Sequence, residues 1–131
     1  MDMTCRAGRH CVFMLHCHLI FVTKYRGAVF NAAHLETLES ICRNVCELVE
    51  FNGGSDHVHM LLNFPPKVAI SKLVNSLKGV SSRKMKLHHP DLHNPAWKSD
   101  ALWSPSYFAG SVGGAPLEVI KKYIEQQNRP H

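Results

Sequence analysis

Two pairs of histidines have a spacing that could hold a metal ion. They are His16-Cys17-His18 and His57-Val58-His59, and in each pair one residue separates the two imidazoles. In an extended strand, residues two apart lie on the same face about 7 Å apart along the chain, so each pair could chelate one ion. Ten histidines among 131 residues make chance pairs common, and a lone pair on a strand is more often packed or hydrogen-bonded than metal-binding. Spacing alone does not choose between the two pairs.

A tyrosine and a glutamine near the carboxyl end could form the second half of such a site. Tyr123 and Gln127 are four residues apart, so in a helix they lie on one face with Cβ atoms about 6 Å apart and can reach a common point. An arbitrary pair of this kind is more often a half-buried tyrosine beside an exposed glutamine. Here Leu117, Ile120 and Ile124 already supply the apolar stripe, so the tyrosine is not needed to make the helix amphipathic.

A long stretch without acidic residues is the third functional signal. Between His57 and Pro90 there is no aspartate or glutamate, although the formal net charge of the whole chain is only +5. A stretch of one sign favours a surface that binds a polyanion, usually nucleic acid, and the alternative is a solvated basic helix face. The basic residues of the stretch are Lys67, Lys72, Lys78, Arg83, Lys84 and Lys86.

Length and composition limit the kind of protein that carries these residues. With 131 residues, of which 45% are hydrophobic and 19% charged, we expect a single domain over 1–131, with residues 1–10 as a loosely ordered leader. Five cysteines without a CxxC pair argue against a disulfide framework or a zinc ribbon. The longest apolar run is too short to span a membrane and no secretory signal opens the chain, so we expect a cytoplasmic protein.

Hydrophobic periodicity predicts the elements that position the candidate residues. Alternation with a period of two indicates strands, and apolar residues at helical spacing indicate helices. Residues 52–55, between the second and third strands, are types that tolerate positive φ in a turn. The expected strands are 12–23, 48–51, 57–64 and 101–110, and the expected helices are 31–46, 68–88 and 115–128.

The order of these elements predicts the fold class. A β-α-β-β-α-β order followed by one more helix is that of the split βαβ, ferredoxin-like α+β arrangement, in which helices cover one face of an antiparallel sheet. The first and third strands are neighbours in that arrangement, which would place His16 and His18 beside His57 and His59 in a supporting or packing role. The helix over 115–128 would add Tyr123 to this core as a C-terminal catalytic helix.

Five stretches, taken together, resemble the small single-tyrosine HUH transposases of bacterial insertion sequences, which move as single-stranded DNA. Each stretch alone is a weak signal, but the set has the order and spacing of that family over about residues 16–127. The stretches are HLIFVTKYR (18–26), DHVHMLL (56–62), ISKLVNSLKG (70–79), LWSPSY (102–107) and KYIEQQ (122–127).

The resemblance implies roles for individual residues. The second histidine pair is the metal-binding one in that family, so His57, His59 and Gln127 are implied as ligands of one Mg²⁺ or Mn²⁺, and Tyr123 as the nucleophile. Its phenolate would attack a phosphodiester of single-stranded DNA, forming a covalent 5′-phosphotyrosine and freeing a 3′-hydroxyl. Gln126 is a fallback ligand, turned about 100° from Gln127 around the helix.

The resemblance also implies partners. Members recognise hairpin DNA near the ends of the element, and they are homodimers in which the final helix of one subunit completes the histidine site of the other. The glycine-containing connection 111–115 would permit such an exchange. The expected phosphate contacts are Lys24, Arg26, Lys72, Lys78, Arg83, Lys84 and Lys86, and Trp97, Trp103 or Tyr107 could stack an unpaired base.

The side chains are chemically suited to this reaction. A phosphotyrosine conserves the energy of the broken bond, so rejoining needs no nucleotide cofactor, and the chain has no GxxxxGK[ST] loop to hold one. Two imidazoles and a carboxamide are neutral ligands, which leave the ion its double charge for the scissile phosphate.

Two other functions stay open from the sequence. A hairpin-binding protein without cleavage, a domesticated relative, would use the basic helix alone. A small metal-binding regulator of the same fold would leave the acid-free stretch without a role.

Overall fold

The structure is a computed structural model that describes residues 2–5, 11–92 and 102–111. Its strands are β1 (Asp2–Cys5), β2 (Cys11–Thr23), β3 (Glu47–Gly53), β4 (His57–Phe64) and β5 (Trp103–Ser111). Its helices are α1 (Ala32–Val45) and α2 (Ile70–His88), with one 3-10 turn, η1 (Lys24–Arg26). The expected helix over 115–128, with Tyr123, Gln126 and Gln127, lies outside the described residues, as does Trp97.

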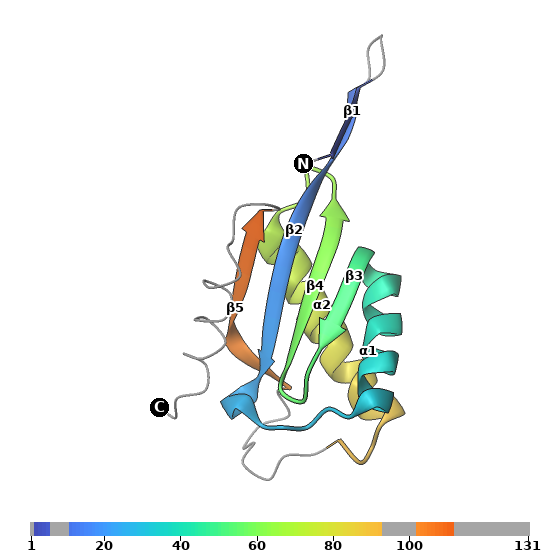
Figure 1. Cartoon of the computed structure of the whole chain (residues 1–131), viewed down its shortest axis with the longest axis vertical. Helices are drawn as coiled ribbons and strands as arrows, with labels where there is room; N and C mark the ends of the chain where they lie inside the picture. Colours follow the sequence, from blue (N-terminus) through green and yellow to red (C-terminus); the bar gives the residue numbers. More distant parts are fainter. Residues whose placement is uncertain (1, 6–10, 93–101, 112–131) are drawn as a thin grey trace.

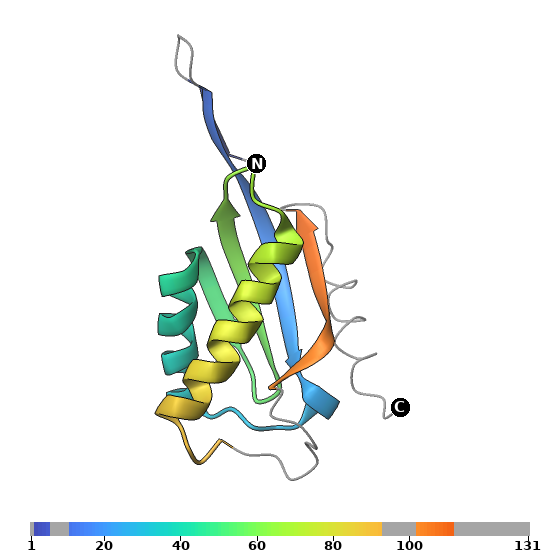
Figure 2. The same ribbon diagram turned by 180° about the vertical axis from the view of Figure 1, so that it is seen from behind.

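The strands form an antiparallel sheet whose order confirms the expected ferredoxin-like α+β fold. β2 lies at the centre between β4 and β5, and β3 pairs with the other edge of β4. β1 pairs with the first residues of β2 and extends this strand pair beyond the rest of the sheet (Figure 1). Both helices cover the same face of the sheet (Figure 2). The first and third predicted strands, β2 and β4, are therefore neighbours, as expected.

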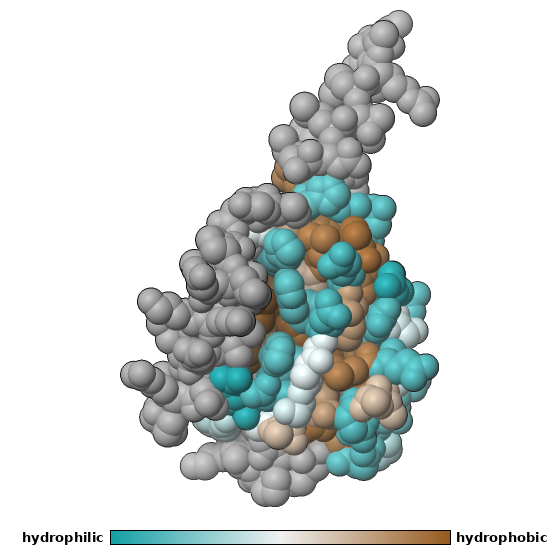
Figure 3. Space-filling model, in the orientation of Figure 1, coloured by the Kyte–Doolittle hydropathy of each residue, from teal (hydrophilic) through white to brown (hydrophobic). Residues whose placement is uncertain are grey.

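Alternation along the two central strands divides the sheet into an apolar face and a mixed face. Leu19 and Phe21 of β2 and Val58 and Met60 of β4 are buried in one core with Leu77 of α2. The residues between them point to the opposite face, because successive side chains of a strand alternate. That face carries no described helix, and hydrophilic and hydrophobic side chains are interleaved on it (Figure 3). Both histidine pairs lie there.

The predicted element boundaries hold for α1 and β4 and shift elsewhere. Asn31 caps α1 as predicted, and its side chain accepts a hydrogen bond from the His34 backbone N–H at 2.9 Å. The second helix begins at Ile70 rather than at Val68, because Ala69 has an extended backbone, with φ −73° and ψ 132°, and is the N-cap residue.

The structure differs from the sequence expectations at two further places. Residues 2–5 form β1 and pair with β2, so they are not part of a loose leader. Neither Gly53 nor Gly54 has a positive φ; the positive φ values of non-glycine residues are 56° at Tyr25 and 53° at Arg26. A Cβ at Gly53 would lie 3.2 Å from the backbone oxygen of His57 and 2.7 Å from the movable Cδ2 of Leu35, so this position has little room for a side chain.

Cys17, Cys42 and Cys46 are free thiols in the structure, and no disulfide framework was predicted. Cys17 and Cys42 are buried in the core, and burial raises the pKa of Cys42 to about 12. Within the described part of the chain, neither helix combines the length and the apolar character needed to cross a membrane.

Replacing Leu77 by alanine should lower the free energy of unfolding by about 2–5 kcal/mol, because its fully buried side chain would leave a cavity between α2 and the sheet. Leu87→Ala is the matched control on the same helix, since Leu87 is 75% exposed, and it should change the free energy by less than about 0.5 kcal/mol. Urea denaturation measures both. Equal losses for the two variants would contradict this placement of the core.

Candidate metal and DNA site

The second histidine pair lies at the start of β4 on the face of the sheet without described helices. His57 pairs with Val22 of β2 and His59 pairs with Ile20, while Val58 between them is buried in the core. The two imidazoles therefore share one face of the sheet, as the period of two predicted.

The imidazole of His57 is held by residues of the β3–β4 turn. Its Nδ1 lies 2.9 Å from Oδ1 of Asp56, and the other carboxylate oxygen accepts a hydrogen bond from Nε of Arg26 at 2.6 Å. The backbone of Gly54 approaches the same ring so closely that a Cβ there would lie 2.8 Å from Cε1 of His57. Residue 54 must therefore be glycine if the ring is to keep its position.

A strained turn after β2 brings Arg26 to Asp56. Tyr25 and Arg26 both have left-handed backbone conformations, which cost non-glycine residues roughly 1–2 kcal/mol each. The buried Thr23 anchors the turn: its N–H donates to the Asp56 carbonyl at 2.9 Å, and its hydroxyl donates to the Gly27 carbonyl at 2.7 Å. Asp56 was not among the predicted site residues, although it directly precedes the histidine pair.

His59 contacts the first histidine pair. Its Nε2 lies 2.9 Å from Nδ1 of His18, so one of these two nitrogens carries the shared proton. Burial is the main cause that lowers the pKa of His59, and His18 and His57 lower it further, whereas Glu50 acts in the opposite direction. The neutral imidazole, which is the form that binds metals, is therefore favoured at His59. The expectation that the two pairs lie side by side is confirmed for His18.

His16 lies one step further from the second pair. It is directly opposite Asn63 in the β2–β4 register. Its Nε2 and the Asn63 Oδ1 are buried and have no hydrogen-bond partner in the structure. The first pair is therefore divided: His18 contacts the second pair, whereas His16 faces an amide.

The predicted phosphate contacts fall on both sides of the sheet. Lys24 and Arg26 belong to η1, next to the turn that holds His57. Lys72, Arg83 and Lys84 are exposed on α2, and Lys86 is partly exposed on the same helix. Because α2 covers the face opposite the histidines (Figure 2), most of the basic stretch is separated from the histidine pair by the thickness of the sheet.

Lys78 and Arg26 have protein partners in this structure, and their assignment as phosphate contacts stays a prediction. The Lys78 ammonium donates to the carbonyl of Ser104 at 2.7 Å and to those of Pro105 and Ser106 at 3.2 and 3.3 Å. The β2–β5 register shifts at this place, so these carbonyls are not all used by the sheet. Burial lowers the pKa of Lys78. Arg26 is paired with Asp56 and its side chain is only 14% exposed.

Of the described aromatic candidates for base stacking, Trp103 is buried and Tyr107 is partly buried. Trp103 is 5% exposed, and its Nε1 donates to the Ser81 hydroxyl at 2.9 Å. Its ring and that of Tyr107 both contact Phe21 edge-on, with centroid distances of 5.5 and 6.5 Å. Trp103 is therefore a core residue rather than a stacking surface.

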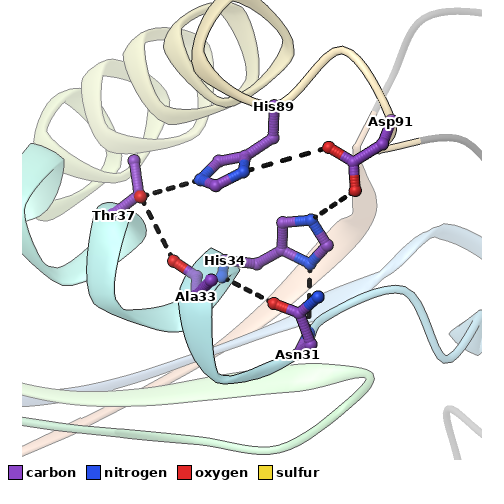
Figure 4. A network of polar contacts seen from close by, with 6 residues as sticks. All are labelled: Asn31, Ala33, His34, Thr37, His89 and Asp91. Carbon is purple, nitrogen blue, oxygen red and sulfur yellow. Dashed lines mark hydrogen bonds and ion pairs between the residues drawn. The ribbon is translucent and has the colours of Figure 1, made fainter.

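A second cluster of metal-type side chains, His34, His89 and Asp91, joins the two helices. One ligand atom from each lies within 4.8 Å of the others. The Asn31 backbone N–H donates to Nδ1 of His34, so a neutral His34 carries its proton on Nε2, which lies 3.1 Å from Asp91 Oδ2 (Figure 4). His89 Nε2 lies 2.7 Å from the Thr37 hydroxyl. His34 keeps no free lone pair for an ion, so we interpret the cluster as a hydrogen-bond network that joins α1 to the end of α2.

Comparison with known proteins shows a consistent relationship along nearly the whole chain. The profile of the family described as "Transposase IS200 like" matches residues 11–127. The ISDra2 transposase TnpA of Deinococcus radiodurans is 35% identical over 133 residues, covering 98% of this chain and 94% of the relative. The transposase for insertion sequence element IS200 of Salmonella typhimurium is 32% identical over 115 residues, covering 84% of this chain and 74% of the relative.

Solved structures show the same fold. A crystal structure of a candidate transposase from Deinococcus radiodurans R1 superimposes with a TM-score of 0.81 at 34% identity, covering 95% of this chain and 99% of that one. A REP-associated tyrosine transposase bound to a REP hairpin superimposes with a TM-score of 0.51 at 13% identity, covering 92% and 67%. At this low identity, the second comparison supports the fold alone.

Replacing Lys78 by methionine should destabilise the protein by about 1–3 kcal/mol and leave the salt dependence of DNA binding unchanged, because its ammonium serves three carbonyls rather than a phosphate. Lys84→Met is the matched control: Lys84 is exposed on the same helix, so stability should hold while the salt-dependence slope falls by about one. Urea denaturation and fluorescence anisotropy with a hairpin oligonucleotide measure the two effects. A lower salt-dependence slope of DNA binding for Lys78→Met would show that Lys78 contacts a phosphate.

Proposed function

This chain belongs to the IS200-like transposase family, and from that premise we propose that it cuts and rejoins single-stranded DNA through a covalent 5′-phosphotyrosine at Tyr123. Membership of the family implies a DNA strand-transfer enzyme. The observation that carries the finer proposal is the placement of His57 and His59 on one face of β4, clear of the helices that cover the other face.

The residues of this face fit a divalent cation, either Mg²⁺ or Mn²⁺. His57 and His59 from β4 and Gln127 from the carboxyl-terminal segment would hold it. The two imidazoles share one face of β4, and burial lowers the pKa of His59, which favours the neutral imidazole that a cation binds. When bound, the ion would act as a Lewis acid on the scissile phosphate and orient it.

Tyr123 would perform the covalent step. Its phenolate oxygen forms a bond to the phosphorus while the bond from phosphorus to the 3′-oxygen breaks, and that oxygen takes up a proton as a free 3′-hydroxyl. The reverse attack by a 3′-hydroxyl rejoins the strand and releases the tyrosine. Of the other two tyrosines, Tyr107 packs on Phe21 and lies beneath the Lys78 ammonium, which indicates a structural role.

We propose hairpin DNA as the ligand and a homodimer with composite sites as the assembly. The REP-associated relative, which shares the fold, was solved with a hairpin. Among the predicted phosphate contacts, Lys72, Arg83 and Lys84 are exposed on α2, and Lys24 and Lys86 are partly exposed. Lys78 and Arg26, which contact protein groups, stay predictions. The connection 111–115, which contains two glycines, would let the final helix reach a partner subunit.

A hairpin-binding protein without cleavage is the second candidate function. It is favoured by one observation, the exposure of Lys72, Arg83 and Lys84 on α2, on the side of the sheet away from the histidines. DNA bound to this surface of α2 would lie away from the histidine pair and would not be cleaved.

A covalent protein–DNA adduct is the expected product when the full chain meets a hairpin oligonucleotide taken from the DNA that flanks its own gene. The oligonucleotide carries its label at the 3′ end, because a 5′-phosphotyrosine retains the downstream strand. We expect a labelled band in denaturing gels that requires Mg²⁺ or Mn²⁺ and is absent in Tyr123→Phe.

Tyr25→Phe is the matched control for the adduct, since Tyr25 is 64% exposed in η1 and should not be the nucleophile. It should form the adduct as the natural chain does. A gel shift of the same hairpin without any adduct, with no need for a metal, would support the non-cleaving function instead.

Mixing two inactive chains tests the composite site. A Tyr123→Phe chain supplies an intact histidine pair and a His57→Ala chain supplies an intact tyrosine, so a mixed dimer contains one complete site if the helix is exchanged. Some cleavage should return on mixing, measured with the same labelled hairpin. Mixed dimers that form, as shown by differently tagged chains, and stay inactive would exclude exchange between subunits.

A further inference from the structure

We propose that Asp56 is a positioning residue that fixes the tautomer of His57, and that Arg26 holds the Asp56 carboxylate in place for this purpose. The inference rests on the proposed function, because it concerns how a histidine is prepared to bind a cation. Asp56 has no predicted role from the sequence, and Arg26 was predicted to contact DNA phosphates.

The chemical character of the partner decides which nitrogen of His57 carries the proton. A carboxylate only accepts hydrogen bonds, so the 2.9 Å contact between Nδ1 of His57 and Oδ1 of Asp56 requires a proton on Nδ1. In a neutral imidazole, Nε2 then keeps its lone pair. A carboxylate that accepts a hydrogen bond from one ring nitrogen orients a metal-binding histidine and raises the basicity of the other nitrogen as a metal ligand.

The surrounding backbone limits how the His57 ring can move. A Cβ at Gly54 would lie 2.8 Å from Cε1, 3.2 Å from Nδ1 and 3.6 Å from Nε2 of the ring, so the backbone of this residue packs against its side. The Gly54 N–H also donates to the His57 carbonyl at 2.9 Å. The ring is therefore confined by the turn, and the hydrogen bond to Asp56 selects the nitrogen that stays free.

Arg26 completes the arrangement by holding the second carboxylate oxygen. The Arg26 Nε to Asp56 Oδ2 distance is 2.6 Å, and the two side chains are 14% and 18% exposed. A carboxylate so shielded from water needs a partner for each oxygen, and here a guanidinium and an imidazole share the two. The turn that brings Arg26 there has a left-handed backbone at residue 26, with a φ of 53°. The strain is consistent with a requirement for this contact.

Another histidine of the same chain shows the opposite arrangement. Nδ1 of His34 accepts a hydrogen bond from the Asn31 backbone N–H at 3.0 Å, so its proton must be on Nε2. The partner type, carboxylate or N–H, thus sets opposite tautomers at His57 and His34. His34 serves as an internal reference for the experiment below.

The first measurement is the tautomer of His57 by ¹⁵N NMR of the metal-free full chain, at a pH where the imidazole is neutral. The natural chain should show a protonated Nδ1 at His57 and a protonated Nε2 at His34. In Asp56→Asn the amide can either accept or donate, so His57 should lose the pure Nδ1–H pattern while His34 keeps its own. Glu39→Gln, which removes a carboxylate from an exposed pair with Arg43, is the matched control and should leave both patterns unchanged.

The second measurement is the affinity for Mn²⁺ alone, from the electron paramagnetic resonance signal of free Mn²⁺. Asp56→Asn should weaken binding about 10- to 100-fold, the usual effect of losing a hydrogen-bond partner of a metal-binding histidine. The double variant Arg26→Gln/Asp56→Asn should behave likewise. It removes both shielded charges together, so it remains informative if Asp56→Asn alone does not fold.

Either of two results would overturn the proposal. One is a His57 that keeps the Nδ1–H tautomer in these variants, and the other is a changed tautomer with Mn²⁺ affinity within twofold of the natural chain. Neither measurement uses DNA or Tyr123. If the tautomer and Mn²⁺ results are as expected but no covalent adduct forms, the proposed strand transfer fails while this inference stands.

Discussion

The pairing of β2 with β4 is the interaction on which the rest of this structure depends. Both strands alternate with a period of two, and their register places the core residues of each strand on one face and the histidines, with the apolar Ile20 and Val22, on the other. A shift of one residue would turn Val58 outward and bury His57 and His59 against the helices. The burial of Leu19, Phe21, Val58 and Met60 thus keeps the histidine pair outside the core.

Hydrogen-bond partners then determine what each imidazole can do. His57 meets a carboxylate, His59 meets another imidazole and His34 meets a backbone N–H, at distances between 2.9 and 3.0 Å. The carboxylate beside His57 leaves the lone pair of the other ring nitrogen available to a metal ion. At His34 the backbone N–H and the Asp91 carboxylate use both ring nitrogens. Histidine is therefore a candidate metal ligand at position 57, whereas at position 34 it joins parts of the fold through hydrogen bonds.

Charge in the sequence is an incomplete guide to charge on the surface. The acid-free stretch correctly indicated a basic helix, and Lys72, Arg83 and Lys84 are exposed on α2. Lys78 belongs to the same stretch, but the irregular pairing of β5 around Pro105 presents three carbonyls to it. Arg26 is used by a carboxylate 30 residues away. Counting cations along the chain cannot separate these roles, because each depends on a backbone group from another element.

Local pattern was sufficient for much of this protein. Strand and helix periods, the Asn31 cap and the order of elements led to the ferredoxin-like fold, and the motifs from His18 to Gln127 led to the family. These features depend on neighbours within a few residues, which the sequence displays directly. The contacts of Asp56 with Arg26, of His18 with His59 and of His34 with Asp91 join residues 30, 41 and 57 positions apart. They depend on strand register, a strained turn and helix packing, so only the tertiary structure decided which side chains are paired and which nitrogen of each histidine is free.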